Sequence, residues 1–134
     1  MTKRIVIIGG GPAGYEAALV GAKYGAEVTV VEDAGMGGSS VLYDCVPSKA
    51  FIAATGVRTD MRRADDMGLR PDFSSRKIDF TAVNDRVRHL AESQSDDVRA
   101  QMEREGIRML QGRGRLDDYE PGRITHYVTV ELLE

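Results

Sequence analysis

Four glycines within six residues form the first group whose types and spacing could do chemistry. Gly9, Gly11 and Gly14 fit the spacing G-x-G-x-x-G, with Pro12 and Ala13 between the second and third glycine. The first glycine permits a tight turn, the second lets a pyrophosphate approach the backbone, and the third allows a helix to pack closely on a strand. The unpaired N–H groups at the start of that helix attract phosphates. The motif therefore predicts a dinucleotide site.

An acidic residue stands 18 positions after the last glycine of this motif. This residue, Glu32, follows the β-branched run Val28 to Val31, and a carboxylate at that place accepts hydrogen bonds from a ribose 2′-hydroxyl. The same charge would repel a 2′-phosphate, which disfavours NADP at this ribose. The motif does not discriminate NAD from FAD, and a glycine-rich turn without a ligand stays open as the alternative.

A single cysteine, Cys45, lies in the segment from Gly37 to Lys49, which reads GGSSVLYDCVPSK. One cysteine excludes an internal disulfide framework and a zinc site built from several thiolates. The two histidines, His89 and His126, are expected to be ordinary structural side chains, so we expect no metal site. Any thiol chemistry of this chain therefore depends on Cys45 alone, in a segment rich in glycine and serine.

Residues 1–36 are predicted to form a strand–helix–strand unit that positions the glycine motif. The apolar run Ile5 to Ile8 has no alternation, which is typical of a strand buried on both faces of a parallel sheet. Small residues from Ala13 to Lys23 predict a helix that ends at Gly25. The run Val28 to Val31 predicts the second strand.

The remainder of the chain divides into the segment 37–49 with the cysteine, helices over 50–106 and strands over 107–134. We expect a loop over 33–44, a helix over 48–66 that Pro47 opens at the first helical position, and a connection over 68–75. A long helix over 80–105, ending at Gly106, carries one apolar stripe: Val83, Val87, Leu90, Ala91, Val98 and Met102. Strands are expected over 107–110 and 127–133, with a turn over 112–114.

The composition sets the class of protein. The chain has 134 residues, about one domain, and needs neither disulfides nor metal ions to fold. Its 18 basic and 21 acidic residues give a net charge of -3, which does not support a nucleic-acid partner. The first apolar run stops at Gly9, too early for a secretory signal, and no run approaches the length of a membrane span. We therefore expect a cytoplasmic protein.

The segment from Gly37 to Lys49 resembles the redox-active segment of the flavoprotein disulfide reductases, the family of dihydrolipoamide dehydrogenase and glutathione reductase. The family pattern is roughly G-G-T-C-x-N-x-G-C-x-P-S-K. Ser39 stands for the threonine, and six residues match in register: Gly37, Gly38, Cys45, Pro47, Ser48 and Lys49. The resemblance extends over essentially the whole chain. It implies an α/β fold, a Rossmann-like FAD-binding domain with a parallel sheet, a long helical excursion and a small antiparallel β segment, incomplete relative to the family.

One departure from the family pattern changes the expected reaction, because the first of the two family cysteines is Ser40 here. The family disulfide joins the positions of Ser40 and Cys45 and relays electrons from the flavin to the substrate. A serine hydroxyl cannot form that bond. The resemblance therefore implies hydride transfer from NAD(P)H to FAD, with electrons leaving the flavin directly for a quinone-type acceptor. The chain is similar to a branch of the family, the NAD(P)H:quinone reductases that lack a redox cysteine.

The same resemblance implies roles for individual residues. Cys45 and Lys49 are the catalytic candidates, with the thiol beside the flavin ring and the ammonium near flavin N5. Gly114 would offer backbone groups to the adenine. Cys45 is either a thiolate that tunes the flavin or an inert remnant. Four residues would line the pyrophosphate and ribitol: Gly37, Gly38, Ser39 and Ser40.

Family members are much longer than this chain and carry a second Rossmann-type domain for NAD(P)H and a C-terminal interface domain. We therefore expect the chain to be the N-terminal FAD-binding portion of a longer, homodimeric enzyme that binds NAD(P)H outside this segment. The 134-residue piece alone would bind FAD poorly and would not turn over. Two alternatives stay open. One is a dihydrolipoyl dehydrogenase-type or single-thiol disulfide reductase using Cys45, and the other is a non-catalytic FAD-binding fragment or interaction module.

Overall fold

The computed structural model describes residues 2–69, 78–118, 121–122 and 124–133. Its first elements are β1 (Arg4–Ile8), α1 (Pro12–Lys23) and β2 (Glu27–Glu32). Gly25 ends α1 in the left-handed region, with φ +78°, and its N–H donates to the Ala22 carbonyl at 2.8 Å. The predicted strand–helix–strand unit is confirmed.

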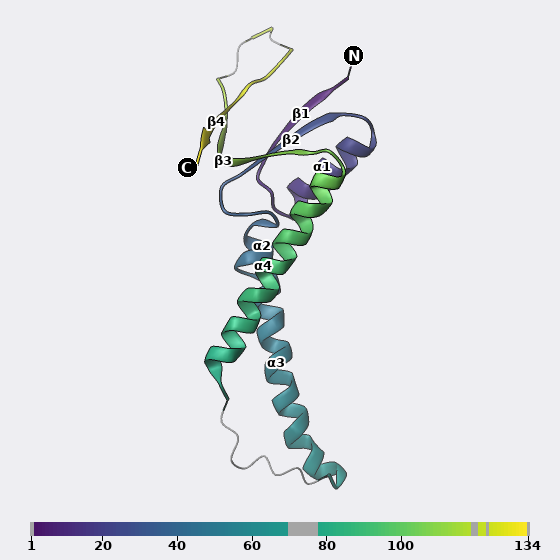
Figure 1. Ribbon diagram of the computed structural model, residues 1–134, viewed down its shortest axis with the longest axis vertical. Helices are drawn as coiled ribbons and strands as arrows, with labels where there is room; N and C mark the ends of the chain where they lie inside the picture. The colour runs from purple at the N-terminus through teal and green to yellow at the C-terminus, as the bar shows by residue number, and fades with distance from the viewer. Residues whose placement is uncertain (1, 70–77, 119–120, 123, 134) are drawn as a thin grey trace.

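The four strands form one sheet in the order β1-β2-β3-β4, with β3 at Arg108–Leu116 and β4 at Val128–Leu132. The pairs β1–β2 and β2–β3 are parallel, whereas β3–β4 is antiparallel. In Figure 1 the sheet curls, and β4 lies beside the C-terminal part of β3, residues 112–116. The predicted parallel sheet with a small antiparallel segment is confirmed.

The hydrophobic core lies between one face of the sheet and the helices α1 and α4 (Phe80–Arg104). Its buried side chains come from both helices, from β2 and the loop after it, and from the residue before β3: Ala18, Val28, Val30, Met36, Val98, Met102 and Ile107. The prediction that the first strand is buried on both faces is wrong. Val6 is 46% and Ile8 48% exposed, because the helices in the described part of the chain cover only the opposite face.

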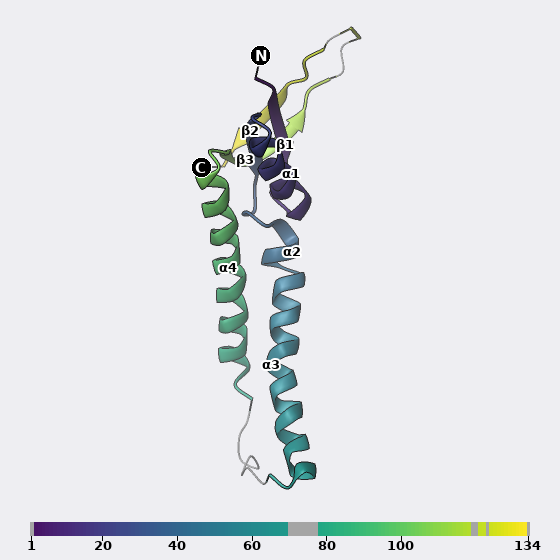
Figure 2. The same cartoon turned by 90° about the vertical axis from the view of Figure 1, so that its right-hand side faces the viewer.

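The helices α3 (Cys45–Arg63) and α4 lie side by side and extend away from the sheet, as Figures 1 and 2 show. The short helix η1 (Ala64–Met67) follows α3. Asp79 caps α4, accepting a hydrogen bond from the Ala82 N–H at 3.0 Å. Most of the predicted apolar stripe of α4 is buried, but Leu90 is 37% exposed. Of the connection expected over 68–75, residues 70–75 lie outside the described residues.

Two local predictions are wrong. Residues 33–44 were expected to be a loop, but they contain the helix α2 (Gly38–Leu42), which starts after Gly37 in the left-handed region. Residues 112–114 were expected to be a turn, but they continue β3. A Cβ on Gly112 would collide with the Glu131 carbonyl oxygen of β4. Gly112 therefore allows β3 and β4 to pair closely. The local sequence does not show this, because the contact is with another strand.

We expect Gly56→Ala to raise the free energy of unfolding by about 0.5–1 kcal/mol. Gly56 lies inside α3, its φ is not positive, and an added Cβ would meet nothing within 4 Å. Gly68→Ala is the matched control. An added Cβ there also meets nothing, but φ is +77°, so alanine is strained and stability should fall. Urea unfolding measures both, and a destabilised Gly56→Ala would contradict the assigned helix.

Candidate functional site

The glycine motif forms the connection between β1 and α1. Gly9 turns the chain with φ +102°, and its N–H donates to the Val31 carbonyl of β2 at 2.8 Å. Gly11 is the N-cap of α1 and supplies no side-chain cap, and the first turn of the helix has no acidic residue. The N-terminal amides of α1 are therefore not capped by a side chain and carry the positive end of the helix dipole.

The space around the three motif glycines fits a bound pyrophosphate. A Cβ on Gly9 or Gly11 would meet nothing within 4 Å, so the outer side of the loop is open. A Cβ on Gly14 would collide with the Gly9 carbonyl oxygen, so the inner side has no spare room. An anion can thus approach the backbone from outside while the helix packs tightly on the strand inside.

Glu32 lies at the end of β2 and contacts the glycine loop directly. Its Oε2 accepts a hydrogen bond from the Gly10 N–H at 2.6 Å, and its Oε1 accepts one from the Ala34 N–H at 2.8 Å. The carboxylate therefore joins the glycine loop to the segment after β2 through two backbone donors. Each oxygen keeps a further lone pair that can accept a ribose hydroxyl.

A pocket of about 250 Å³ lies at the carboxyl ends of β1 and β2, beside the middle of β3. Three predicted residues from distant parts of the sequence line it: Gly9, Glu32 and Gly114. Carboxyl ends of parallel strands are the usual place for ligands in α/β sheets. The other lining residues are Ile8, Val31, Asp33, Gly112 and Arg113.

Two further residues of the pocket, Asp33 and Arg113, belong to none of the motifs in the sequence. The Arg113 Nε donates to Asp33 Oδ2 at 3.2 Å across 80 residues of sequence. The side chains are 75% and 44% exposed, so the pair adds little stability by itself. Its effect is local, because it ties β3 to the segment after β2 at the rim of the pocket. Of the two residues only Asp33 has a signal in the sequence, which is its position directly after a strand.

The start of α2 lies against the glycine loop. The Gly37 N–H donates to the Gly10 carbonyl at 2.8 Å, and a Cβ on Gly38 would lie 3.0 Å from the Gly11 Cα. The structure therefore brings these two predicted residues to the glycine loop. Ser39 and Ser40 are the next two residues of α2, and Ser39 is exposed whereas Ser40 is half-buried.

Cys45 and Lys49 do not line the pocket at the strand ends. Cys45 is the first residue of α3, and both side chains are exposed. Their spacing of four places them on one face of the helix, one turn apart. The helix was expected to begin near Pro47, but it begins at Cys45. Proline is tolerated there because the first turn has no N–H bonded within the helix.

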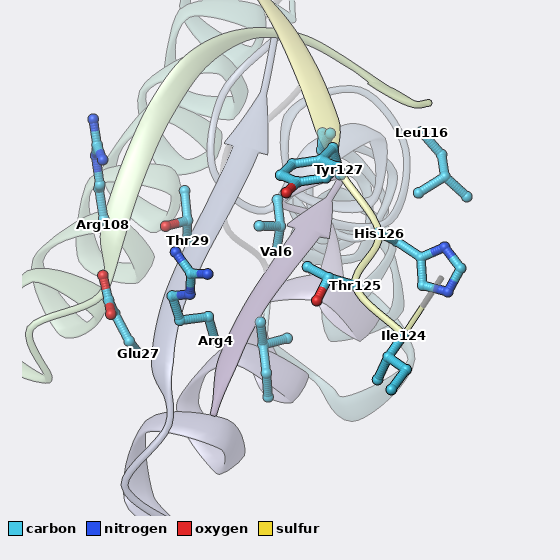
Figure 3. A pocket seen from close by; sticks show the side chains of 12 residues that line it. Arg4, Val6, Glu27, Thr29, Arg108, Leu116, Ile124, Thr125, His126 and Tyr127 are labelled. Carbon is cyan, nitrogen blue, oxygen red and sulfur yellow. The ribbon is translucent and has the colours of Figure 1, made fainter. Parts of the chain in front are cut away.

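A larger hollow of about 700 Å³ lies on the open face of the sheet, as Figure 3 shows. It is lined by residues at the starts of three strands, Arg4, Glu27 and Arg108, and by the segment before β4, including His126 and Tyr127. None of the predicted cofactor residues lines it. Because ligands in parallel sheets bind at the opposite, carboxyl ends of the strands, the smaller pocket is the better candidate. In the described ranges, no helix is long and apolar enough to cross a membrane.

A profile of the family described as "Pyridine nucleotide-disulphide oxidoreductase" matches residues 3–128 of the chain. A protein of Mycobacterium tuberculosis (strain ATCC 25618 / H37Rv) named "NAD(P)H dehydrogenase (quinone)" is 50% identical over 131 residues. That match covers 96% of this chain and 27% of the relative. A "Dihydrolipoyl dehydrogenase 2" of Haloarcula marismortui is 31% identical over 122 residues, 91% of this chain and 25% of the relative.

The chain is also similar to a solved structure, the crystal structure of LpdA from Mycobacterium tuberculosis. The TM-score is 0.89 at 46% sequence identity, and the match covers 98% of this chain and 28% of that one. The similarity therefore includes the whole arrangement of strands and helices described above. The chain spans about a quarter of the length of the curated relatives it matches.

Proposed function

The chain belongs to the pyridine nucleotide-disulphide oxidoreductase family, and from that premise we propose that it is the N-terminal FAD-binding portion of an NAD(P)H:quinone oxidoreductase. In this proposal residues 1–36 are the dinucleotide unit and residues 37–49 the flavin-contacting segment. Residues 50–106 and 107–134 supply the helices and strands that position them. NAD(P)H binds outside this segment.

Binding of FAD is supported by the fit of the glycine loop and its neighbours. The open side of Gly9 and Gly11 admits a pyrophosphate next to the uncapped start of α1. The Glu32 carboxylate at the end of β2 is available to a ribose hydroxyl. Gly114 brings the backbone of β3 to the same pocket, next to the side chains of Ile8 and Val31.

When bound, FAD would accept a hydride from NAD(P)H and pass its electrons on. The described residues hold and orient the cofactor rather than take part in covalent chemistry. The glycine loop and the dipole of α1 hold the pyrophosphate, and Glu32 holds the ribose. In this proposal the Lys49 ammonium, on the same face of α3 as Cys45, favours negative charge on the neighbouring ring system.

The observation that supports a quinone as the electron acceptor is that the chain has one cysteine, with Ser40 at the place of the first family cysteine. A disulfide relay needs two thiols that are oxidised and reduced together. Since Ser40 cannot supply one, the electron pair leaves the flavin directly. A quinone takes up two electrons and two protons to become a hydroquinone. The 50% identical relative named "NAD(P)H dehydrogenase (quinone)" supports the same acceptor class.

Steady-state assays of the full-length enzyme that carries this chain test the proposal. NAD(P)H oxidation should be rapid with menadione as acceptor and negligible with lipoamide. Robust lipoamide turnover would contradict the proposal and favour a disulfide reductase. Bound FAD without NAD(P)H consumption by any acceptor would favour the binding module instead.

We expect Cys45→Ala to change kcat/KM for menadione by less than about fivefold, which is below about 1 kcal/mol of activation free energy. The reason is that no bond to sulfur forms or breaks in direct transfer to a quinone. Ser40→Ala is the matched control at the other position of the former pair. A loss of about a hundredfold or more in Cys45→Ala alone would favour the single-thiol mechanism.

A further inference from the structure

We propose that Arg113 is a specificity residue for the adenine end of the cofactor, with its guanidinium stacked on the purine ring and held in place by Asp33. The inference rests on the proposed FAD site and deepens it, because the glycine motif and Glu32 select only the pyrophosphate and ribose. It assigns a role to a side chain that the glycine motif, the acidic residue and the redox segment do not include.

The shape of the pocket at the strand ends suits a flat ring. Its floor is formed by the backbone of Gly112 and Gly114, which project no side chain, and by the apolar side chains of Ile8 and Val31. A Cβ on Gly114 would lie 3.2 Å from Cγ1 of both Ile8 and Val31, so a side chain at this position would press on both of them. Glycine backbone and aliphatic side chains can contact the face of a planar ring.

The lining of the pocket favours the purine over the flavin ring. Its volume of about 250 Å³ is small for a ligand pocket, so it suits one part of FAD rather than the whole molecule. Glu32, the ribose candidate, stands on its rim. The flavin candidates Cys45 and Lys49, in the first two turns of α3, are absent from its lining.

Arg113 has the geometry to cover a ring in this pocket. It lines the pocket, and its ion pair with Asp33 uses Nε, at one edge of the guanidinium, which leaves the planar face to a ligand. A guanidinium stacks well on aromatic faces. Asp33 is the positioning residue, since its bond across the pocket rim reduces the rotamers that Arg113 would lose on binding.

Titration of the full-length apoprotein with FAD, FMN and ADP tests the inference. Arg113→Gln should weaken binding of FAD and ADP about tenfold, which is about 1.4 kcal/mol, while leaving FMN affinity unchanged because FMN has no adenine. Asp33→Asn should show a smaller loss with the same selectivity. Arg115→Gln is the matched control, since Arg115 is an exposed arginine on the same strand that does not line the pocket.

The variant Arg113→Lys separates stacking from charge. It should bind FAD as weakly as Arg113→Gln, because a lysine keeps the charge but has no planar face. Full recovery of affinity by lysine, or equal losses for FAD and FMN, would overturn the inference. Failure of the wild-type apoprotein to bind FAD at all would instead contradict the proposed function. Unchanged unfolding midpoints are expected for all variants of Arg113.

Discussion

Replacing Gly14 by alanine is expected to lower both the stability of the protein and its affinity for FAD. The added Cβ would collide with the Gly9 carbonyl oxygen and lie 3.0 Å from the Gly9 carbonyl carbon. Gly9 cannot move away easily, because its N–H is bonded to the Val31 carbonyl at 2.8 Å. The start of α1 must therefore move off the sheet, and forced separation of this kind costs about 1–3 kcal/mol. We expect at least a tenfold loss of FAD affinity, because the helix amides no longer face the pyrophosphate.

Gly11→Ala is the matched control for this prediction. Gly11 has φ -68°, which alanine adopts freely, and an added Cβ would meet nothing within 4 Å. Its stability should therefore be close to that of the wild type, while the methyl group blocks the approach of the pyrophosphate. Urea unfolding and flavin titration of the two variants separate the roles of the two glycines. Wild-type stability in Gly14→Ala would contradict the close contact between loop and helix.

Replacing Glu32 by glutamine is expected to have the second-largest effect. The carboxylate accepts bonds from two backbone N–H groups, those of Gly10 and Ala34, with one oxygen each. An amide offers one acceptor oxygen and an NH₂ group, so one N–H would face a donor. Bonds to charged groups contribute about 1.5–3 kcal/mol, and partial exposure reduces the loss here to about 1 kcal/mol. FAD affinity should fall at least tenfold, because the loop loosens and the ribose loses a charged acceptor.

Binding of FMN distinguishes the two causes of that loss. FMN lacks the adenosine ribose, so Glu32→Gln should weaken FMN binding less than FAD binding. Glu16→Gln, at an exposed position of α1, is the control for a change of charge alone. Glu32→Asp should not recover the affinity, since the shorter side chain cannot reach both N–H groups. Unchanged FAD affinity in Glu32→Gln would contradict the assigned role.

The parts of the fold that depend on local spacing could be predicted from the sequence. The glycine motif, the helix after it and Glu32 all lie within one strand–helix–strand unit. Short-range spacing along the chain is therefore enough to place them. The strand role of Gly112 could not be predicted, because it depends on Glu131 in a partner strand much later in the chain. The short helix α2 was missed because glycine and serine are also typical of loops.

The candidate site likewise contains residues that could be predicted from the sequence and residues that could not. Gly9, Glu32 and Gly114 were predicted separately, from the motif, the second strand and the resemblance, and the structure shows that they share one pocket. The pair of Asp33 and Arg113 was not predictable, since only the parallel pairing of β2 with β3 brings the two residues together. The exposure of Val6 and Ile8 also depends on which elements cover the sheet, not on their own pattern.

The central claim is that electrons leave the flavin without a pair of thiols. An anaerobic titration of the full-length enzyme with dithionite, followed by the visible flavin spectrum, tests it most directly. We expect reduction to be complete after about two electrons per bound flavin, because Ser40 leaves Cys45 without the partner thiol of the family disulfide. Uptake of about four electrons per flavin, with a long-wavelength charge-transfer band at the midpoint, would show a second two-electron couple such as a disulfide and would contradict direct transfer from the flavin.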